Sequence, residues 1–382
     1  MRIGISAIHV RPGKSGSHQP YLVNLVSAMS KLETPHEFIL FVTPANQCLF
    51  ENSRNKMEFV IYPALAEEVL PRIFLEQMRL PLDARRRKID VLHYPGTTAS
   101  FLLRRSDVVT VHHDSVTQRM SMSSIRNIYY DTALMIIKRA GRIIAPSQVY
   151  ADELVKYFGY RPEQVQPVHH GVSSIFRNVA GSEVEKVREK YGIEPNAILT
   201  VTNTRPHKNI PNLLRAYHLL ITRYCLENQL VMVGCIEETV LMQIISDISD
   251  DPEHMRSRIN VIPFLPHEQL PPIYSAAAVF VFFSKVETFG MPLVEAMACG
   301  LPVVASDIPI HREILQNAGL LVPSEAPDAL AAALHKILTN EEYRGLLAQS
   351  ALSRSQQFSW EKTARQTLQV YEDSWSSTRK GQ

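Results

Sequence analysis

The chain has 382 residues, of which 45% are hydrophobic and 20% charged, as in soluble globular proteins. This length and composition predict two domains and exclude disordered, collagen-like and coiled-coil proteins. No stretch approaches the roughly 20 apolar residues of a transmembrane helix, and Met1–Ser6 reads directly into a strand, unlike a signal peptide. The four cysteines lack CxxC spacing, which argues against a disulfide framework or zinc cluster and favours a reducing, cytoplasmic location.

Positive charge is concentrated in the first half of the chain. Residues 1–180 contain 22 Lys and Arg against 15 Asp and Glu, whereas residues 181–382 contain 18 against 23. The clusters Arg85–Lys88 and Arg104–Arg105 both lie in the basic half. This asymmetry indicates an anionic partner such as phospholipid or a lipid phosphate, and the alternative is a solvated helix end. Nucleic acid is not expected, since no basic-aromatic stripe or nucleic-acid motif accompanies the charge.

Short Val- and Ile-rich segments alternate with longer helical stretches along the first half. Continuous apolar segments of this length are typical of strands buried on both faces, so the alternation predicts a parallel sheet covered by helices. The predicted strands are Ile3–Ile8, Phe38–Val42, Phe59–Tyr62, Val91–Tyr94, Val108–His112 and Ile143–Ala145. The predicted helices include Tyr21–Leu32 and Val69–Arg87.

The second half repeats this plan without any visible sequence repeat. Its predicted strands are Ile198–Val201, Leu230–Val233, Val261–Ile262, Val279–Phe283, Val303–Ala305 and Leu320–Val322. Its predicted helices are Ile210–Tyr224, Glu268–Ser275, Leu293–Cys299 and Ala326–Leu338.

The expected fold class is α/β, with two doubly wound Rossmann-like domains. We expect an N-terminal domain over 1–172, a polar linker over 173–192, a C-terminal domain over 193–357 and a last helix over 358–382 that crosses back. Two such domains would face each other across a cleft, with ligands outside the carboxyl ends of the strands. Functional residues should therefore follow strands.

The most informative segment is Ser284–Ala296, which follows the predicted strand Val279–Phe283 and leads into a helix. Gly290 permits close approach of a ligand to the backbone, and the free amides of a helix start attract phosphate or sugar oxygens. Glu287 stands before this helix and Glu295 within it. Two carboxylates beside such a turn suit a ligand rich in hydroxyl groups, and the alternative is one capping and one surface glutamate.

Three further segments follow predicted strands. Asn203–Asn209 contains Arg205 and Lys208, two cations that can hold a diphosphate or remain solvated. Thr110–Asp114 contains two adjacent histidines, and the loop Arg11–Pro20 contains Gly16 without forming a GxGxxG or Walker A pattern.

The frame Ser-x-x-Glu-x-Phe-Gly-x-Pro-x-x-Glu-Ala, with Glu287 and Glu295 separated by seven residues, resembles the signature of the family 4 retaining glycosyltransferases of GT-B fold. Ala298–Ser306 and Gly319–Pro323 are also similar to that family, and Arg205-Pro-His-Lys-Asn resembles its diphosphate-binding loop. Thr202 and Asn203 depart from the glycines of many members, and Gly16-Ser17 stands where many have Gly-Gly. The resemblance runs from the first strand to Trp360.

The resemblance implies a retaining transferase that moves a hexose from a nucleoside diphosphate sugar to a saccharide or lipid-linked acceptor without a metal or another cofactor. The C-terminal domain should hold the donor and the basic N-terminal domain the acceptor. The Arg205 loop resembles mannosyltransferase branches, which favours GDP-mannose over UDP-glucose. The alternatives are a GT-B nucleotide-sugar epimerase or hydrolase and a non-catalytic sugar-nucleotide-binding protein.

The same resemblance implies roles for individual residues. Arg205 and Lys208 should stabilise the leaving diphosphate, Glu287 should hold sugar hydroxyls and Glu295 the ribose. A histidine should contact the donor sugar, and the sequence register favours His112 over His113. The backbone is expected to meet the sugar at Phe289, Gly290 and Met291, the phosphate at Leu293 and Val294, and the phosphate or acceptor at Gly16.

An apolar stretch precedes the basic cluster Arg85–Lys88. Its apolar residues are Val69, Leu70, Ile73, Phe74, Met78 and Leu80. These residues form either the core-facing side of a helix or a peripheral contact with the inner face of an anionic membrane.

Overall fold

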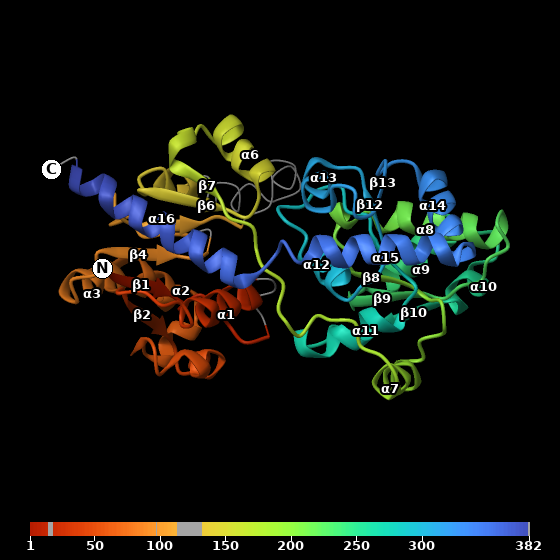
Figure 1. Cartoon of the computed structure of the whole chain (residues 1–382), viewed down its shortest axis with the longest axis horizontal. Helices are drawn as coiled ribbons and strands as arrows, with labels where there is room; N and C mark the ends of the chain where they lie inside the picture. Colours follow the sequence, from red (N-terminus) through yellow and green to blue (C-terminus); the bar gives the residue numbers. More distant parts are fainter. Residues whose placement is uncertain (14–17, 97, 113–131, 381–382) are drawn as a thin grey trace. The chain divides into compact units, whose positions relative to one another are not determined.

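The computed structural model describes residues 1–13, 18–96, 98–112 and 132–380. It divides into two compact units: unit 1 contains Met1–Gly171 and Ser359–Gln382, and unit 2 contains Val172–Phe358. Each unit is built around one parallel sheet with helices on its faces (Figure 1). The two doubly wound domains predicted from the alternating segments are therefore confirmed.

Unit 1 contains a seven-stranded sheet in the order β3-β2-β1-β4-β5-β6-β7, and all its strand pairs are parallel. The strand order reverses between β1 and β4, which makes this the switch point of a doubly wound sheet. The strands are β1 Arg2–Ser6, β2 Glu37–Val42, β3 Glu58–Ile61, β4 Val91–Tyr94, β5 Val108–Thr110, β6 Arg142–Ala145 and β7 Val165–Pro167.

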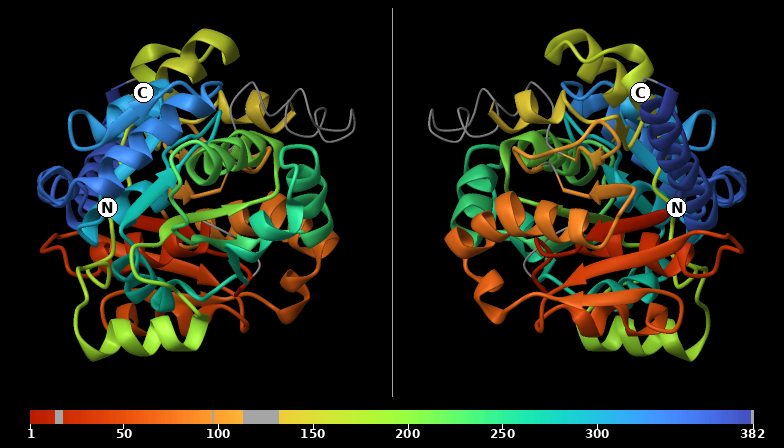
Figure 2. Two further views of the ribbon diagram at one scale, coloured as in Figure 1. Left: turned by 90° about the vertical axis from the view of Figure 1, so that its right-hand side faces the viewer. Right: turned by 90° about the vertical axis from the view of Figure 1, so that its left-hand side faces the viewer.

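Helices cover both faces of this sheet, as Figure 2 shows for α2 and α3 on one side and α16 on the other. Tyr371 of α16 lies against the sheet, where its hydroxyl is 2.8 Å from Nδ1 of the buried His93 on β4. Ser359 caps the first turn of α16, since its Oγ accepts from the Lys362 amide at 3.2 Å. Among the described residues, the α-helices of unit 1 are α1 His18–Met29, α2 Val69–Phe74, α3 Leu80–Arg86, α6 Gln148–Phe158 and α16 Trp360–Lys380, with a further helical stretch over 132–137.

Unit 2 contains a six-stranded parallel sheet in the order β10-β9-β8-β11-β12-β13. Its switch point lies between β8 and β11. All four residues of β11 are buried, as expected for a central strand with helices on both faces. The strands are β8 Ile198–Asn203, β9 Leu230–Cys235, β10 Ile259–Ile262, β11 Val279–Phe282, β12 Val303–Ser306 and β13 Leu320–Val322.

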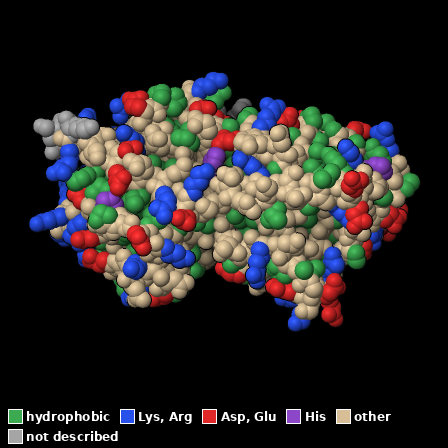
Figure 3. Space-filling model, in the orientation of Figure 1, with side chains coloured by type: hydrophobic (Ala, Val, Ile, Leu, Met, Phe, Trp, Pro, Cys, Tyr) green, Lys and Arg blue, Asp and Glu red, His purple; other side chains and the backbone are tan. Residues whose placement is uncertain are grey.

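The helices of unit 2 follow the strands and pack on the sheet or on one another. Their bounds are α7 Ser182–Tyr191, α8 Ile210–Thr222, α9 Glu238–Ser246, α10 Pro252–Ser257, α11 Leu270–Ala276, α12 Met291–Ala298, α13 Pro309–Leu315, α14 Pro327–Thr339 and α15 Glu341–Ser355. In Figure 3, charged side chains of both signs are interspersed over the face shown.

The segment expected as a polar linker, 173–192, differs from that expectation. It belongs to unit 2, and its second half forms α7, which contacts α11. Val184 is the buried residue of this helix, and most of its other residues are polar or charged. Its sequence therefore resembles that of an exposed linker. Arg188 nevertheless ties α7 to unit 2 by donating to the Ala276 carbonyl at 3.0 Å.

The stretch expected as one helix, Val69–Arg87, is helical from Val69 to Arg86, with a π-turn over Leu75–Arg79 between α2 and α3. Leu75 and Leu80 are buried in the core. Leu70, Phe74, Met78 and Leu82, spaced four residues apart, are 78%, 64%, 43% and 40% exposed. The stretch therefore has both a core-facing side and an exposed apolar side. Among the helices of the described residues, none has the length and apolar character that a membrane span requires.

Candidate active site

Two loops meet at the switch point of unit 2. Strands β8 and β11 are neighbours, and each ends at the same edge of the sheet. The loop after β8 contains Arg205 and Lys208, and the loop after β11 contains Glu287. The Lys285 amide joins the loops by donating to the His207 carbonyl at 2.7 Å. Sheet topology thus brings together segments about eighty residues apart.

Lys208 and Glu287 form a short ion pair in this edge. Nζ of Lys208 lies 2.5 Å from Oε1 of Glu287, and the side chains are only 16% and 14% exposed. Burial alone would raise the pKa of Glu287, but the Lys208 charge and hydrogen bonds from Lys208 and Ser284 hold that pKa below its ordinary value. Nζ also lies 5.2 Å from the centre of the Phe282 ring. A lysine ammonium has three donors, so this pair leaves donors for a ligand oxyanion.

A buried hydrogen-bond chain supports Glu287 from β12 and α13. Nδ1 of His311 lies 2.8 Å from the Ser306 carbonyl oxygen, and Oγ of Ser306 donates to the Ser284 carbonyl. Ser284 in turn hydrogen-bonds Glu287 through its side chain. His311 is fully buried, and burial lowers its pKa to about 4, so the imidazole that donates through Nδ1 is neutral near pH 7.

The turn after Glu287 depends on glycine. Gly290 has φ +94°, a conformation that other residues rarely adopt, and an added Cβ would lie 3.1 Å from Phe282. It precedes α12, whose second residue, Pro292, has no amide hydrogen. The Leu293 amide donates to the Gly290 carbonyl at 3.0 Å, so this amide, expected to meet phosphate, is engaged inside the turn. Of the first three residues of α12, Pro292 has no amide hydrogen and the amide of Leu293 is engaged, which leaves the amide of Met291 for a ligand.

Glu295 lies on α12 and is almost completely buried. Its Oε1 is 2.7 Å from Nε2 of His267, and its Oε2 accepts from the Tyr274 hydroxyl at 3.0 Å. Burial alone would lower the pKa of His267, but the hydrogen bond and charge of Glu295 raise it. Two of the lone-pair positions of the carboxylate are thus used, and others remain for a ligand hydroxyl.

Arg205 differs from Lys208 in its surroundings. Its side chain is exposed, and within the described part of the chain no carboxylate pairs with it. Its amide donates to Oδ1 of Asn203 at 3.0 Å, which shapes the loop. Asn209 closes the loop with φ +57° and its side-chain amide donates to the Ser324 carbonyl at 2.8 Å. Arg205 is thus an exposed cation in the same loop as Lys208, which is held by its ion pair with Glu287.

In unit 1, a group of aromatic rings surrounds His112, which follows β5. The ring centres of Tyr21 and His112 are 4.3 Å apart, and those of His170 and His112 are 5.2 Å apart. His18 is also in edge contact with His112 at 5.0 Å. Burial, followed by the neighbouring histidines, lowers the pKa of His112 well below its ordinary value, so this imidazole is neutral.

The structure brings two of the residues expected from the sequence, Lys208 and Glu287, into contact, and it adds partners that were not expected. Phe289, Leu293 and Val294 are buried. Gly16 and His113 lie outside the described residues. The supporting residues His267, Tyr274 and His311 were missed, although His311 follows a strand by the same rule that identified Lys208. Among the described residues, no group of His, Cys, Asp and Glu side chains is arranged to hold a metal ion.

Comparisons with known proteins agree with this arrangement. Residues 183–354 match the family described as glycosyl transferases group 1, and residues 19–174 match Glycosyltransferase Family 4. The chain is 30% identical over 232 residues to O-antigen chain mannosyltransferase B of Escherichia coli, covering 60% of each chain. It is 31% identical over 262 residues to a D-inositol 3-phosphate glycosyltransferase of Streptomyces bingchenggensis, covering 64% of this chain and 55% of the relative.

The chain therefore spans little more than half the length of these curated relatives. The solved structures match along nearly the whole chain. The Anabaena protein HepE, crystallised in complex with UDP-glucose, has a TM-score of 0.74 and 19% identity and covers 97% of this chain and 99% of its own. A likeness at this level of identity shows the shared fold.

Proposed function

Because the chain belongs to the group 1 glycosyltransferases of GT-B fold, we propose that it transfers a hexose from a nucleoside diphosphate sugar to a saccharide or lipid-linked acceptor, with retention of anomeric configuration. The observation that carries this proposal is the ion pair between Lys208 and Glu287 at the switch point of unit 2. It joins a cation suited to a leaving diphosphate with a carboxylate suited to sugar hydroxyls.

The reaction follows from these groups. The bond between the anomeric carbon and the diphosphate oxygen breaks, and the acceptor oxygen bonds to the same face of the sugar. The leaving diphosphate oxygen takes the acceptor proton. Lys208, with Arg205, stabilises the negative charge that develops on the diphosphate. Two cations can do this without a metal, so we propose metal-independent transfer.

Different residues are proposed to contact the sugar, the phosphate and the ribose of the donor. Glu287 accepts from hydroxyls of the sugar, which also meets the backbone at Phe289, Gly290 and Met291. The phosphate lies nearer the start of α12, where Val294 stays a proposed contact and Leu293 is engaged by Gly290. Glu295 accepts from the ribose. In unit 1, neutral His112 is proposed to hydrogen-bond the donor sugar.

For the donor, we propose GDP-mannose. The Arg205 loop supports this choice, as does the name of the E. coli relative, a mannosyltransferase. The competing donor is UDP-glucose, the ligand of the HepE structure.

The donor is tested by thermal unfolding with GDP, UDP, ADP and their sugars. A ligand that binds only the folded protein raises its apparent stability by mass action, so GDP-mannose should give the largest shift. Turnover of the donor with and without acceptor then separates a transferase from an epimerase or hydrolase. Sugar release or isomerisation that needs no acceptor would refute transfer, and NMR of the anomeric proton in the product tests retention.

We also propose that unit 1 binds the surface of an anionic membrane, on its cytoplasmic side. The apolar stripe Leu70, Phe74, Met78 and Leu82 is exposed, and Arg85, Arg86 and Lys88 beyond it are exposed as well. Arg87 differs because it is 2.5 Å from Glu58. An apolar stripe beside basic residues matches an interfacial helix, and each basic residue near an anionic surface contributes about 1 kcal/mol. This placement would favour a lipid-linked acceptor.

Sedimentation with liposomes tests the membrane contact. The protein should pellet with anionic liposomes at low salt and be released at high salt. Phe74→Ser should reduce pelleting, whereas the control Leu346→Ser removes an apolar side chain of similar exposure from α15 and should not. Equal recovery with neutral and anionic liposomes at low salt would refute the contact while leaving the transferase proposal intact.

A further inference from the structure

A polar cavity lies in unit 2, at the edge of the sheet opposite Lys208 and Glu287. Its volume is about 330 Å³, near the lower limit for small-molecule sites. It is lined by residues that precede β8, β11 and β12, and by side chains of α7, α11 and α15. The residues of the candidate active site follow the carboxyl ends of these strands, so the cavity is a separate place in the fold.

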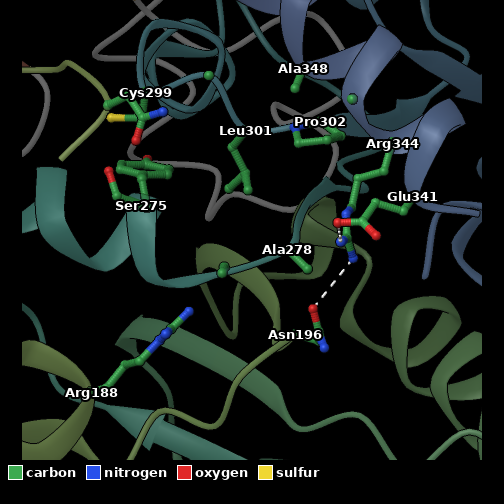
Figure 4. Close-up of a pocket in the computed structure, with 15 residues that line it drawn as sticks. Arg188, Asn196, Ser275, Ala278, Cys299, Leu301, Pro302, Glu341, Arg344 and Ala348 are labelled. Atoms are coloured by element: carbon green, nitrogen blue, oxygen red, sulfur yellow. Dashed lines mark hydrogen bonds and ion pairs between the residues drawn. The ribbon is translucent and has the colours of Figure 1, made fainter. Parts of the chain in front are cut away.

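Two arginines dominate the chemistry of this cavity. Figure 4 shows Arg188 entering from α7 and Arg344 from α15, on opposite sides of the space. Both side chains are about three-quarters buried, at 26% and 24% exposed. The neutral polar groups beside them include Asn178 and Asn196, and Arg344 donates to Oδ1 of Asn196 at 3.3 Å.

The positive charge of these arginines is poorly neutralised by the protein. Arg188 lies 3.4 Å from Glu185, which is 71% exposed, and Arg344 lies 3.6 Å from Glu341, which is 91% exposed. Because both carboxylates are exposed to water, which screens their charge, these pairs offset little of the positive charge of the arginines. Nε of Arg188 is also buried without an acceptor among the described residues.

Other arginines of unit 2 show what full neutralisation looks like in this fold. Arg258 makes two bonds to Glu194, at 3.0 and 2.7 Å, and Arg256 makes two to Glu238, at 2.8 and 3.1 Å. The two cavity arginines lack any such paired carboxylate. Guanidinium groups bind carboxylates and phosphates with paired hydrogen bonds, so their free capacity selects an oxyanion.

We propose that this cavity binds a small molecule bearing a phosphate or carboxylate group, held between Arg188 and Arg344. The volume suits a small metabolite rather than a nucleotide sugar. None of the residues proposed to touch the donor or the acceptor lines the cavity, although Tyr274, which donates to Glu295, does. The proposal does not depend on the transferase activity, because it is argued from the arginines of the cavity alone.

Gly345 offers a test that leaves the fold intact. It lines the cavity from α15, and a Cβ added there would meet nothing within 4 Å. Gly345→Asp therefore places a negative charge at the cavity without a steric clash, and Gly345→Ala is its matched control. Arg344→Gln removes one of the two cations. Its control is Arg223→Gln, which removes a charge 62% exposed on unit 2 outside the cavity.

The probes are inorganic phosphate and succinate, which separate the two oxyanions, titrated at constant ionic strength while thermal unfolding is followed. The wild-type protein should be stabilised by at least one of them. Gly345→Asp and Arg344→Gln should weaken the apparent affinity about tenfold or more, the value of one charge-assisted hydrogen bond, and both controls should keep it.

Phosphate could also reach the diphosphate loop, so Lys208→Met is titrated in parallel. The proposal predicts that this variant keeps the stabilisation. Stabilisation lost with Lys208→Met but kept by both cavity variants would overturn the cavity site. So would the absence of any stabilisation of the wild-type protein.

Discussion

Replacing Lys208 with methionine tests the central element of the site. Methionine retains much of the length of lysine but removes the charge that lies 2.5 Å from Glu287. Glu287 would then be a carboxylate that is only 14% exposed and has lost its cation. Of the two donors whose hydrogen bonds lower its pKa, Lys208 and Ser284, only Ser284 would remain. Losing one member of a buried pair costs about 3 kcal/mol of unfolding free energy, at the lower end of the range because some exposure remains.

The effect should depend on pH with a definite sign. In the wild-type protein the pKa of Glu287 is lowered, so the pair stabilises the fold above the ordinary carboxyl pKa and this stabilisation is lost in acid. In Lys208→Met, the charge and hydrogen bond of Lys208 no longer oppose burial, which is the largest influence on the pKa of Glu287 and raises it. The neutral form is then preferred in the folded state, so the stability deficit of the variant should be large at pH 8 and small near pH 4.

Urea unfolding across that pH range measures the deficit, and donor turnover measures catalysis. Turnover should fall roughly a hundredfold or more, as for loss of a preorganised charged donor. The double variant Lys208→Met with Glu287→Gln should recover stability because no buried charge remains, but not activity. The reasoning is refuted by a deficit that does not change with pH, together with unchanged turnover of the purified single variant.

Three further predictions concern the same chemistry. Arg205→Ala should lower turnover as Lys208→Met does but leave the urea midpoint nearly unchanged, because its side chain is exposed; wild-type turnover would remove Arg205 from the diphosphate contact. Activity should survive excess EDTA, because we propose that Arg205 and Lys208 take the place of a metal. Full loss in EDTA that Mn²⁺ restores would contradict this. Stability should fall as pH drops from about 6.5 to 4, because the folded state keeps His311 neutral. The lowered pKa of His311 accounts for a loss of about 3 kcal/mol of unfolding free energy over this range. In His311→Phe, the urea midpoint should therefore fall less between pH 6.5 and pH 4 than in the wild-type protein. An equal fall in both proteins would argue against burial of His311.

The series of buried strands and the segments that follow them could be predicted from the sequence. Strands such as Val91–Tyr94 and Leu320–Val322 have the predicted bounds, because a strand buried on both faces must be continuously apolar. Arg205, Lys208, Glu287 and their loops were identified because polar residues directly after such strands lie at one edge of a parallel sheet. Local patterns suffice for these features.

Only the tertiary structure decided which side chains meet. Lys208 pairs with Glu287 because β8 and β11 are neighbours. Glu295 is held by His267, from the turn before α11, and by Tyr274 of α11. Such contacts depend on strand order, which periodicity does not contain. The exposure of Phe74 beside the buried Leu75 also depends on how the helix lies on its sheet. The cavity between Arg188 and Arg344 joins residues 156 positions apart, and no local pattern in the sequence marks it.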